Sequence, residues 1–352
     1  MDHPLVLGIE TSCDDTACAV LDGSGRVLSS VVSSQLAAHR PYGGVVPEIA
    51  SREHLANWPL VSAEALERAG VGLRDVEVVA ATRGPGLVGA LLVGLSIGKA
   101  IAFAGARPFH AVHHLEGHLY SPFLRPPGDP DAPAAPPSRF VGLVLSGGHS
   151  SLFAVEDGAV STLGETRDDA IGEVFDKVGK RLGLPYPQGP RVDELAERGT
   201  PGAHQLPVSR FGDTLDFSYS GLKSQTLLEI ERLERTLGPI DLGDGDAAPQ
   251  AALDLLAAFR ESAVGQVLDR LDRLHQRRPF SLLAVSGGAA ANRLLRRRLP
   301  AWAAGREVDL RLVPLVYSGD NAAMIANAAL LRHRMGISDD PFAAEAESRI
   351  PL

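Results

Sequence analysis

Residues 5–21 read LVLGIETSCDDTACAVL, and residues 140–155 read FVGLVLSGGHSSLFAV. In each stretch an apolar run of strand length meets a turn of small or polar residues, and a second apolar run follows. This is the pattern of a β-hairpin. Because the same strand–turn–strand unit occurs once in each half of the chain, the sequence predicts an α/β protein with two related lobes.

Other segments extend these two units. Periodicity, together with Pro or Gly at the ends, predicts strands at 27–32, 76–81 and 282–286, and helices from Pro47 to about Gly70, over 87–106, from about Ala289, and from Ala322 to about Arg332. Pro59 is expected to bend or break the first of these helices, because it lacks a backbone N–H.

The stretch RPPGDPDAPAAPPS, residues 125–138, is too rich in proline to form a helix or a central strand. We interpret it as a connection between lobes. The predicted division is therefore an N-terminal lobe of residues 1–124 plus 321–352, the connection 125–138, and a C-terminal lobe of residues 139–320.

Composition limits the class of protein. The chain has 352 residues and a net charge of −9, which excludes a nucleic-acid binder that relies on bulk positive charge. Its two cysteines are too few for a disulfide framework, and the first residues lack the basic start of a signal peptide. Residues 87–106 are apolar, but Lys99 near their middle disfavours a membrane span. We expect a cytoplasmic protein without membrane contact.

His114 and His118 are four residues apart, so on a helix their imidazoles share one face and can hold one metal ion. Two neutral ring nitrogens at this spacing suit Zn²⁺ or Fe(II). The spacing can also arise by chance in a stretch that contains His110 and His113 as well. The spacing alone leaves both interpretations open.

The stretch HLEGH, residues 114–118, invites comparison with zinc proteases, in which a glutamate directly follows the first histidine. Here Glu116 is two residues from His114, about 200° around an ideal helix. We expect its carboxylate to point away from an ion held by the histidines. Metalloprotease chemistry is therefore disfavoured.

Three glycine turns suggest phosphate recognition. Ser146-Gly147-Gly148 and Ser286-Gly287-Gly288 each follow an apolar strand, and Gly84-Pro85-Gly86 precedes a helix. Glycine lets backbone N–H groups approach a phosphate, although it also simply makes turns. The chain has neither a Walker lysine pattern nor GxGxxG after the first strand, which excludes a P-loop protein and a Rossmann dehydrogenase.

Carboxylates occur at several turns and helices. Asp14 and Asp15 lie in the first hairpin turn, where aspartate is common, but an acidic turn can also position a cation or accept a proton. Asp320 is expected to cap the last helix with one oxygen and leave the other for an ion. We interpret residues 168–176 as a charged helix face, and the arginines within 293–311 as either a polyanion patch or a solvated face.

These motifs together resemble one known family, the TsaD (also called Gcp or Kae) tRNA threonylcarbamoyltransferases of bacterial type. The matching stretches run almost from end to end: GIETSCDDT (8–16), GGVVPE (43–48), ASREH (50–54), GPGL (84–87), HHLEGH (113–118), SGGH (146–149), FSYSGLK (217–223), ANR (291–293) and DNAAMIA (320–326). The chain departs from the family at Gln188, where glycine is common. Val144 lies near the place of a tyrosine found in archaeal relatives, which supports the bacterial type.

The resemblance implies a two-lobed α/β fold of the actin-like, Hsp70 and sugar-kinase (ASKHA) superfold. It implies an enzyme that transfers threonylcarbamoyl from threonylcarbamoyl-AMP to N6 of adenosine 37 in tRNAs reading codons that begin with A. One divalent ion, Fe(II) ahead of Zn, would be held by His114, His118 and Asp320. The residues that would hold the adenylate are Val144, Leu145, Ser146, Gly147, Gly148, Asp176, Gly189, Asp193 and Asn292.

The resemblance also implies partners: tRNA, the TsaB and TsaE proteins, and a TsaC-type synthase that supplies the adenylate. As the proton acceptor for the attacking amine we hypothesise Asp14 or Asp15. Two alternatives stay open. One is a metallopeptidase, an older label of this family, and the other is an ATPase or phosphotransferase, because this superfold serves many functions.

Overall fold

The structure, a computed structural model, describes residues 4–127, 136–209, 212–243 and 247–352. Its contacts divide the chain into two compact units, unit 1 (Met1–Pro137 with Val313–Leu352) and unit 2 (Ser138–Leu312). The lobe limits at 124 and 320 stay a prediction. Within the predicted Pro-rich connection, residues 128–135 lie outside the described part of the chain.

Unit 1 is built on a five-stranded sheet in the order β3-β2-β1-β4-β5. The strands are β1 (Val6–Glu10), β2 (Asp15–Leu21), β3 (Val27–Ser34), β4 (Val78–Gly84) and β5 (Phe109–His113). The first three form an antiparallel meander, whereas β4 runs parallel to β1 and β5 parallel to β4. The hairpin predicted at residues 5–21 is confirmed.

The helices of unit 1 are α1 (Leu36–His39), α2 (Pro47–Ala69), α3 (Val88–Ala104), α4 (His114–Tyr120) and α10 (Ala322–Arg334). Helix α2 begins at Pro47 and ends before Gly70, which adopts a left-handed conformation with φ 69°, as predicted. The expected break at Pro59 was wrong, because α2 continues through it.

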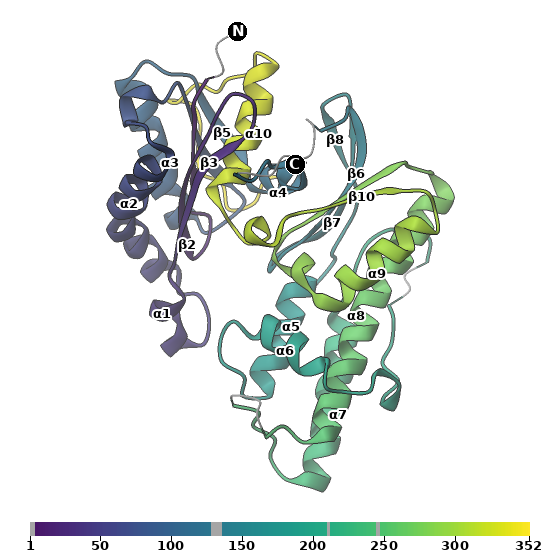
Figure 1. Cartoon of the computed structure of the whole chain (residues 1–352). Helices are drawn as coiled ribbons and strands as arrows, with labels where there is room; N and C mark the ends of the chain where they lie inside the picture. The colour runs from purple at the N-terminus through teal and green to yellow at the C-terminus, as the bar shows by residue number, and fades with distance from the viewer. Residues whose placement is uncertain (1–3, 128–135, 210–211, 244–246) are drawn as a thin grey trace. The chain divides into compact units, whose positions relative to one another are not determined.

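The two faces of this sheet carry different helices. Side chains of a strand alternate between faces, and β1 shows this at Gly8 and Ile9. A Cβ at Gly8 would lie 2.3 Å from the backbone oxygen of Ala322, so α10 packs on the Gly8 face. A Cβ at Gly98 of α3 would lie 3.6 Å from Ile9 Cδ1, so α3 packs on the other face. Figure 1 shows α2 and α3 beside one another on one side of the sheet and α10 on the opposite side.

Unit 2 contains a second five-stranded sheet in the order β10-β9-β6-β7-β8. Its strands are β6 (Arg139–Leu145), β7 (Ser150–Glu156), β8 (Ala159–Glu165), β9 (Leu282–Ser286) and β10 (Asp309–Leu312). An antiparallel meander β6-β7-β8 is again followed by a parallel neighbour of its first strand, β9, and by β10 parallel to β9. The two sheets therefore share one topology, and the predicted duplication is confirmed.

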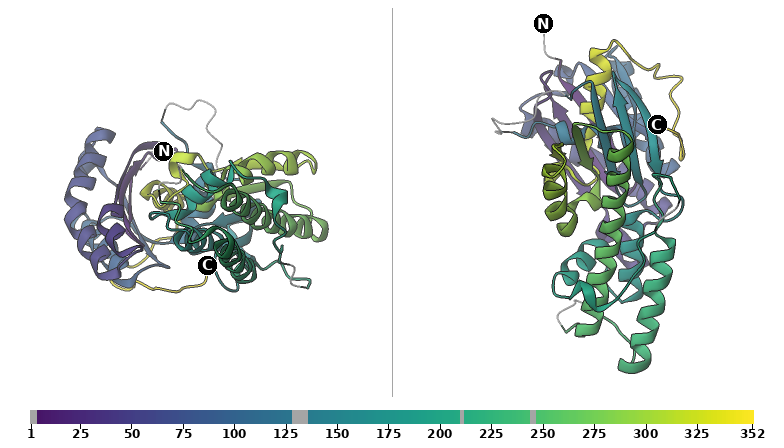
Figure 2. Two further views of the ribbon diagram at one scale, coloured as in Figure 1. Left: turned by 90° about the horizontal axis from the view of Figure 1, so that it is seen from below. Right: turned by 90° about the vertical axis from the view of Figure 1, so that its right-hand side faces the viewer.

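The helices of unit 2 are α5 (Ile171–Arg181), α6 (Gln188–Ala196), α7 (Ser220–Leu237), α8 (Gln250–Arg277) and α9 (Arg293–Ala304). Figure 2 shows α7 and α8, drawn in green, alongside one another, and these two helices are in contact. Two predicted helix starts were wrong. Asp168 and Asp169 precede α5, and a 3₁₀ turn at Gly288–Ala291 precedes α9 because the Asn292 side chain caps that helix.

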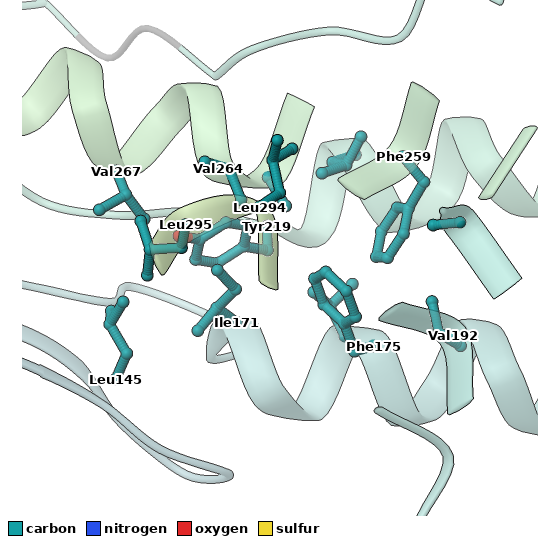
Figure 3. Packing of buried hydrophobic residues seen from close by; sticks show 14 of the residues in the cluster. Leu145, Ile171, Phe175, Val192, Tyr219, Phe259, Val264, Val267, Leu294 and Leu295 are labelled. Carbon is teal, nitrogen blue, oxygen red and sulfur yellow. The ribbon is translucent and has the colours of Figure 1, made fainter. Parts of the chain in front are cut away.

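The core of unit 2 forms where α5, α8 and α9 meet. Figure 3 shows Phe175 of α5 and Phe259 of α8 facing one another, and their ring centroids are 4.7 Å apart. Tyr219, directly before α7, lies in the same cluster with no exposed surface. This apolar cluster holds α5 and α6, which carry Asp176, Gly189 and Asp193 of the predicted adenylate residues.

No helix among the described residues combines the length and the hydrophobicity that a membrane crossing requires.

Replacing Gly8 by alanine tests the close packing of α10 on β1. The new Cβ would lie 2.3 Å from Ala322 O and 2.9 Å from Ala326 Cβ, so the helix must shift. We expect the free energy of unfolding in urea to fall by about 1–3 kcal/mol. Gly44→Ala is the matched control, because nothing lies within 4 Å of that Cβ. Equal stability of the two variants would contradict the packing.

The pH dependence of stability tests the environment of His110 in β5. Its side chain is fully buried and neither ring nitrogen has a hydrogen-bond partner in the described structure. Burial lowers the pKa of His110 to about 4, and the charges of Arg332 and His333 act in the same direction. The charge of Asp339 opposes them. The unfolded chain takes up this proton near pH 6.5, so the folded state loses stability as pH falls from 6.5 to 4.

We expect His110→Leu to remove up to about 3 kcal/mol of this acid-side loss, since one pKa unit corresponds to about 1.4 kcal/mol. Burial also lowers the pKa of His113 and His54, so part of the loss will persist. The measurement is urea unfolding at pH 7.5, 5.5 and 4.5. His333→Leu removes one of the charges that lower the pKa of His110, so we expect it to reduce the acid-side loss by less than His110→Leu does. An unchanged slope with pH in His110→Leu would refute the assignment.

Candidate metal centre

Helix α4 places the two histidines of the HLEGH stretch. Strand β5 ends at His113, whose Nδ1 accepts a hydrogen bond from Leu115 N at 3.1 Å and so caps the helix. Helix α4 begins at His114, and the predicted helical spacing of His114 and His118 is confirmed. Their rings meet edge to face with centroids 4.7 Å apart, and both side chains are buried.

Asp320 reaches the same place from the loop before α10. The expected N-cap role of Asp320 was wrong, because Asn321 caps the helix by accepting a hydrogen bond from Met324 N at 3.0 Å. The Asn321 amide also donates to Tyr317 O and Gly319 O, which holds the loop. Asp320 Oδ1 lies 3.1 Å from His118 Nε2 and 3.6 Å from His114 Nε2.

These three side chains fit a metal ion. One ligand atom from each of His114, His118 and Asp320 lies within 4.8 Å of the other two, and no other such group of three occurs in the described ranges. Ligand atoms about 2.0–2.2 Å from a tetrahedral ion lie about 3.4 Å from each other, close to the two distances from Asp320. The predicted convergence of Asp320 with two histidines more than 200 positions earlier in the chain is thus present in the structure.

The charges around the histidines differ. Burial lowers the pKa of His114, but the charges of Asp320 and Glu10 outweigh burial and raise it to about 9. Burial dominates at His118 and lowers its pKa. Glu10 is fully buried; burial raises its pKa, but the charge and hydrogen bond of His114 reverse the effect and lower it. A cation here would meet the carboxylates of Asp320 and Glu10 in a largely desolvated environment.

The acidic turn between β1 and β2 belongs to the same region of unit 1. Burial, then the charge of Asp320, raises the pKa of Asp15 to about 7, and its Oδ1 has no hydrogen-bond partner in the described structure. Bonds that hold the backbone of the turn include His54 Nε2 to Cys13 O at 3.1 Å, Gln35 N to Asp14 O at 2.9 Å and Leu87 N to Ser12 O at 2.8 Å. A half-buried carboxyl with this pKa can accept a proton near neutral pH.

Glu116 does not join the three candidate ligands. Its carboxylate pairs with Arg332 of α10 at 3.6 Å, and burial raises its pKa. This contact agrees with the expectation that Glu116 points away from the candidate ion. Arg332 lies near the end of α10, whereas Asp320 lies in the loop before its start.

The predicted adenylate residues lie in unit 2. Val144 and Leu145 end β6, and Ser146, Gly147 and Gly148 form the turn that follows. Ser146 N donates to His149 O at 2.8 Å, which closes the turn, and both glycines are exposed with nothing within 4 Å of an added Cβ. The N-terminal turn of α5 abuts this loop, because a Cβ at Gly172 would lie 2.7 Å from Ser146 O.

The other four predicted residues come together in two pairs. Asp176 Oδ1 accepts a hydrogen bond from Gly189 N at 2.7 Å. Asp193 accepts one from Asn292 Nδ2 at 2.8 Å and one from Arg293 N at 3.0 Å. Arg260, buried and not foreseen from the sequence, adds a bond to Asp193 at 3.1 Å. These bonds fix α6 and the start of α9.

Other charged groups have structural partners. Asp168 accepts hydrogen bonds from Ser218, Tyr219 and Ser220, and Asp169 pairs with Lys177 and Lys223. Among the late arginines, Arg297, Arg298, Arg306 and Arg311 pair with Glu197, Glu261, Asp272 and Asp309, respectively. These contacts favour the interpretation as solvated, ion-paired faces over a polyanion patch.

Sequence reasoning missed Glu10 and Ser12, which contact His114. Glu10 Oε2 lies 3.1 Å and Ser12 Oγ 3.2 Å from His114 Nδ1. The one available signal was a charged residue at the end of an otherwise apolar strand, VLGIE. A buried carboxylate needs a partner, but the sequence could not tell which.

Solved structures support the predicted fold class. HypF from T. kodakarensis superposes with a TM-score of 0.60 at 12% identity, over 95% of this chain and 48% of that one. Full-length HypF in its phosphate- and nucleotide-bound form superposes with a TM-score of 0.58 at 13% identity, over 95% of this chain and 47% of that one. At this identity the likeness concerns the fold alone. Together with the two matching sheets, it confirms the α/β ASKHA fold with duplicated lobes.

Sequence relatives identify the family. The TsaD family profile, described as tRNA N6-adenosine threonylcarbamoyltransferase, matches residues 26–327. The tRNA N6-adenosine threonylcarbamoyltransferase of Pelobacter propionicus is 49% identical over 324 residues, 92% of this chain and 90% of the relative. The enzyme of the same name from Burkholderia cenocepacia is 46% identical over 331 residues, which are 93% of this chain and 92% of the relative. The chain therefore belongs to the TsaD family of tRNA N6-adenosine threonylcarbamoyltransferases and is a transferase that modifies tRNA.

Proposed function

We propose that the donor substrate is threonylcarbamoyl-AMP and that the acceptor is N6 of adenosine 37 in tRNAs that read codons beginning with A. The observation that carries this proposal is the convergence of His114, His118 and Asp320 in a chain of this transferase family. An acyl-adenylate is already activated, so the enzyme has to align the two substrates and stabilise the charge on the departing AMP.

We propose one divalent ion per subunit, held by His114, His118 and Asp320, with Fe(II) preferred and Zn as the alternative. Two imidazoles and one carboxylate with open positions are the donor set of many non-haem Fe(II) sites, and Zn accepts the same ligands. When bound, the ion supplies a Lewis acid that polarises a substrate oxygen. The two histidines, both buried, would hold the ion where a charge acts strongly.

We propose that unit 2 binds the adenylate through Val144, Leu145, Ser146, Gly147 and Gly148, with Asp176, Gly189, Asp193 and Asn292. The open backbone of the two exposed glycines supports a phosphate role, because N–H groups there can approach an anion. Asp193 and Asn292 support a positioning role, since their mutual hydrogen bond holds α6 against the start of α9.

We propose that the acidic turn takes the proton from the attacking amine. The N6 nitrogen forms a bond to the carbamoyl carbon, the bond from that carbon to the phosphate oxygen breaks, and AMP leaves. The amine proton passes to the carboxylate of Asp15, with Asp14 as the alternative. A pKa of about 7 and an unpartnered Oδ1 support Asp15.

We propose that TsaB and TsaE assist this chain, that a TsaC-type synthase supplies the adenylate, and that the reaction takes place in the cytoplasm. A net charge of −9 supports helpers for tRNA binding, because the chain lacks the bulk positive charge that attracts RNA. Exposed apolar side chains on α2 (Leu55, Leu60) and α3 (Val88, Leu92) support these helices as the TsaB surface.

The alternatives are not favoured. In zinc proteases the glutamate that directly follows the first histidine activates the metal-bound water, whereas the glutamate of this helix, Glu116, pairs with Arg332. The sequence relatives are tRNA N6-adenosine threonylcarbamoyltransferases, which does not favour a phosphotransferase or an ATPase of the same superfold.

Replacing His114 by alanine tests the metal role. We expect bound metal, measured by inductively coupled plasma mass spectrometry, and the yield of N6-threonylcarbamoyladenosine, measured by mass spectrometry of tRNA nucleosides, to fall together. Loss of a direct ligand should cost at least the roughly 10- to 100-fold that loss of an outer partner costs. The assay contains synthetic threonylcarbamoyl-AMP, tRNA and the partner proteins. His333→Gln is the control. Undiminished transfer by His114→Ala would refute the role.

Replacing Asp15 by alanine, and separately Asp14, tests the proton acceptor. We expect the variant of the true acceptor to bind threonylcarbamoyl-AMP with unchanged affinity in calorimetry but to transfer about 10²- to 10⁴-fold more slowly in single turnover. Lost adenylate binding in both variants would reject a proton-transfer role for this turn.

A further inference from the structure

We propose that Glu10 is a positioning residue for the metal centre, which holds His114 so that Nε2 and not Nδ1 is the ligand atom. This inference rests on the proposed metal site and adds a residue that lies outside the three ligands. It concerns the tautomer and the ring orientation of one histidine. Both must be set before a metal ion can bind.

The carboxylate of Glu10 is held in place by its own hydrogen bonds. Glu10 is the last residue of β1 and has no exposed surface. Its Oε1 accepts a hydrogen bond from Ser12 N, and its Oε2 accepts one from Thr82 Oγ1 of β4 at 2.7 Å. Because these donors come from the turn after β1 and from the neighbouring strand, the carboxylate has little freedom to turn away.

The remaining bond of Glu10 goes to His114. Its Oε2 lies 3.1 Å from His114 Nδ1, and Ser12 Oγ lies 3.2 Å from the same nitrogen. A carboxylate only accepts hydrogen bonds, so Nδ1 carries the proton. With Nδ1 protonated, the lone pair of a neutral His114 is on Nε2, the atom 3.6 Å from Asp320 Oδ1.

His118 shows the contrast. Its Nε2 lies 3.1 Å from Asp320 Oδ1, but its Nδ1 has no hydrogen-bond partner in the described structure. The protein therefore orients one of the two imidazoles through a buried carboxylate and leaves the other without such a contact. Metal-bound histidines commonly donate their second nitrogen to a carboxylate or carbonyl, and His114 is the one arranged for this.

Glu10→Gln is the informative substitution because it keeps the size of the side chain. Ser12 N–H needs an acceptor, so the amide oxygen is expected to take the place of Oε1. The amide NH₂ of the new glutamine then faces His114 Nδ1. If Nδ1 kept its proton, two hydrogen-bond donors would face each other without an acceptor. Nδ1 has to give up its proton, which moves to Nε2 and removes the lone pair from the ligand atom.

The experiment titrates the metal-free full-length chain with Co²⁺ and follows the absorption of the bound ion. We expect Glu10→Gln to bind Co²⁺ about 10- to 100-fold more weakly than the wild type. Glu77→Gln is the matched control, since Glu77, directly before β4, accepts a hydrogen bond from Leu5 N, directly before β1, whereas Glu10 lies at the other end of β1. It should bind like the wild type.

Thr82→Val is a second variant that keeps the carboxylate and removes one bond to it. We expect a smaller loss of affinity than in Glu10→Gln, because His114 keeps its acceptor. Equal Co²⁺ affinity of Glu10→Gln and the wild type would overturn the inference and leave the metal site intact. Failure of the wild type to bind Co²⁺ would overturn the metal site itself and the inference with it.

A spectroscopic measurement covers the case in which Glu10→Gln does not fold. In the Zn²⁺-loaded wild type, ¹⁵N-detected correlation of the histidine rings should show His114 with a protonated Nδ1 and a metal-bound Nε2. Coordination through Nδ1 would contradict the proposal. A purely structural Glu10 would not determine which nitrogen binds the ion.

Discussion

The close approach of α10 to the sheet of unit 1 is the constraint on which the metal centre depends. Gly8 in β1 leaves room for the backbone oxygen of Ala322, at the first residue of the helix. Gly117, between the two histidines of α4, leaves room for Met324 and Ile325, since an added Cβ would lie 3.1 Å and 2.9 Å from their side chains. Two missing Cβ atoms thus let the start of α10 reach both β1 and α4, and Asp320 arrives beside the histidines.

This arrangement gathers charged groups where water is largely excluded. Glu10 and His118 have no exposed surface, and His114 has 5%. Burying such groups without partners would be costly, and the structure offsets the cost by pairing Glu10 and Asp320 with the histidines. The same desolvation raises the pKa of Asp15. The electrostatics of the candidate metal site and the raised pKa of Asp15 therefore share one physical cause, which is desolvation.

Unit 2 uses its carboxylates differently. Asp176 and Asp193 accept hydrogen bonds from backbone N–H groups at Gly189 and Arg293, so they stabilise the ends of helices. The glycine turn after β6 stays open and exposed. The predicted adenylate residues thus combine paired polar groups with an exposed backbone loop, and α5 and α6 pack into the same apolar cluster as α8 and α9.

The sequence by itself determined the duplicated strand–turn–strand units, the helical spacing of His114 and His118, and the family, because each depends on local patterns or on motifs. It was wrong about a helix break at Pro59, through which α2 continues, and about the cap of α10, which the neighbouring Asn321 provides. Only the tertiary structure decided that Glu10 contacts His114 and that Asp320 meets both histidines. Those contacts join residues 104 and about 200 positions apart, and such distances are closed by packing of helices on a sheet, for which local sequence carries no signal.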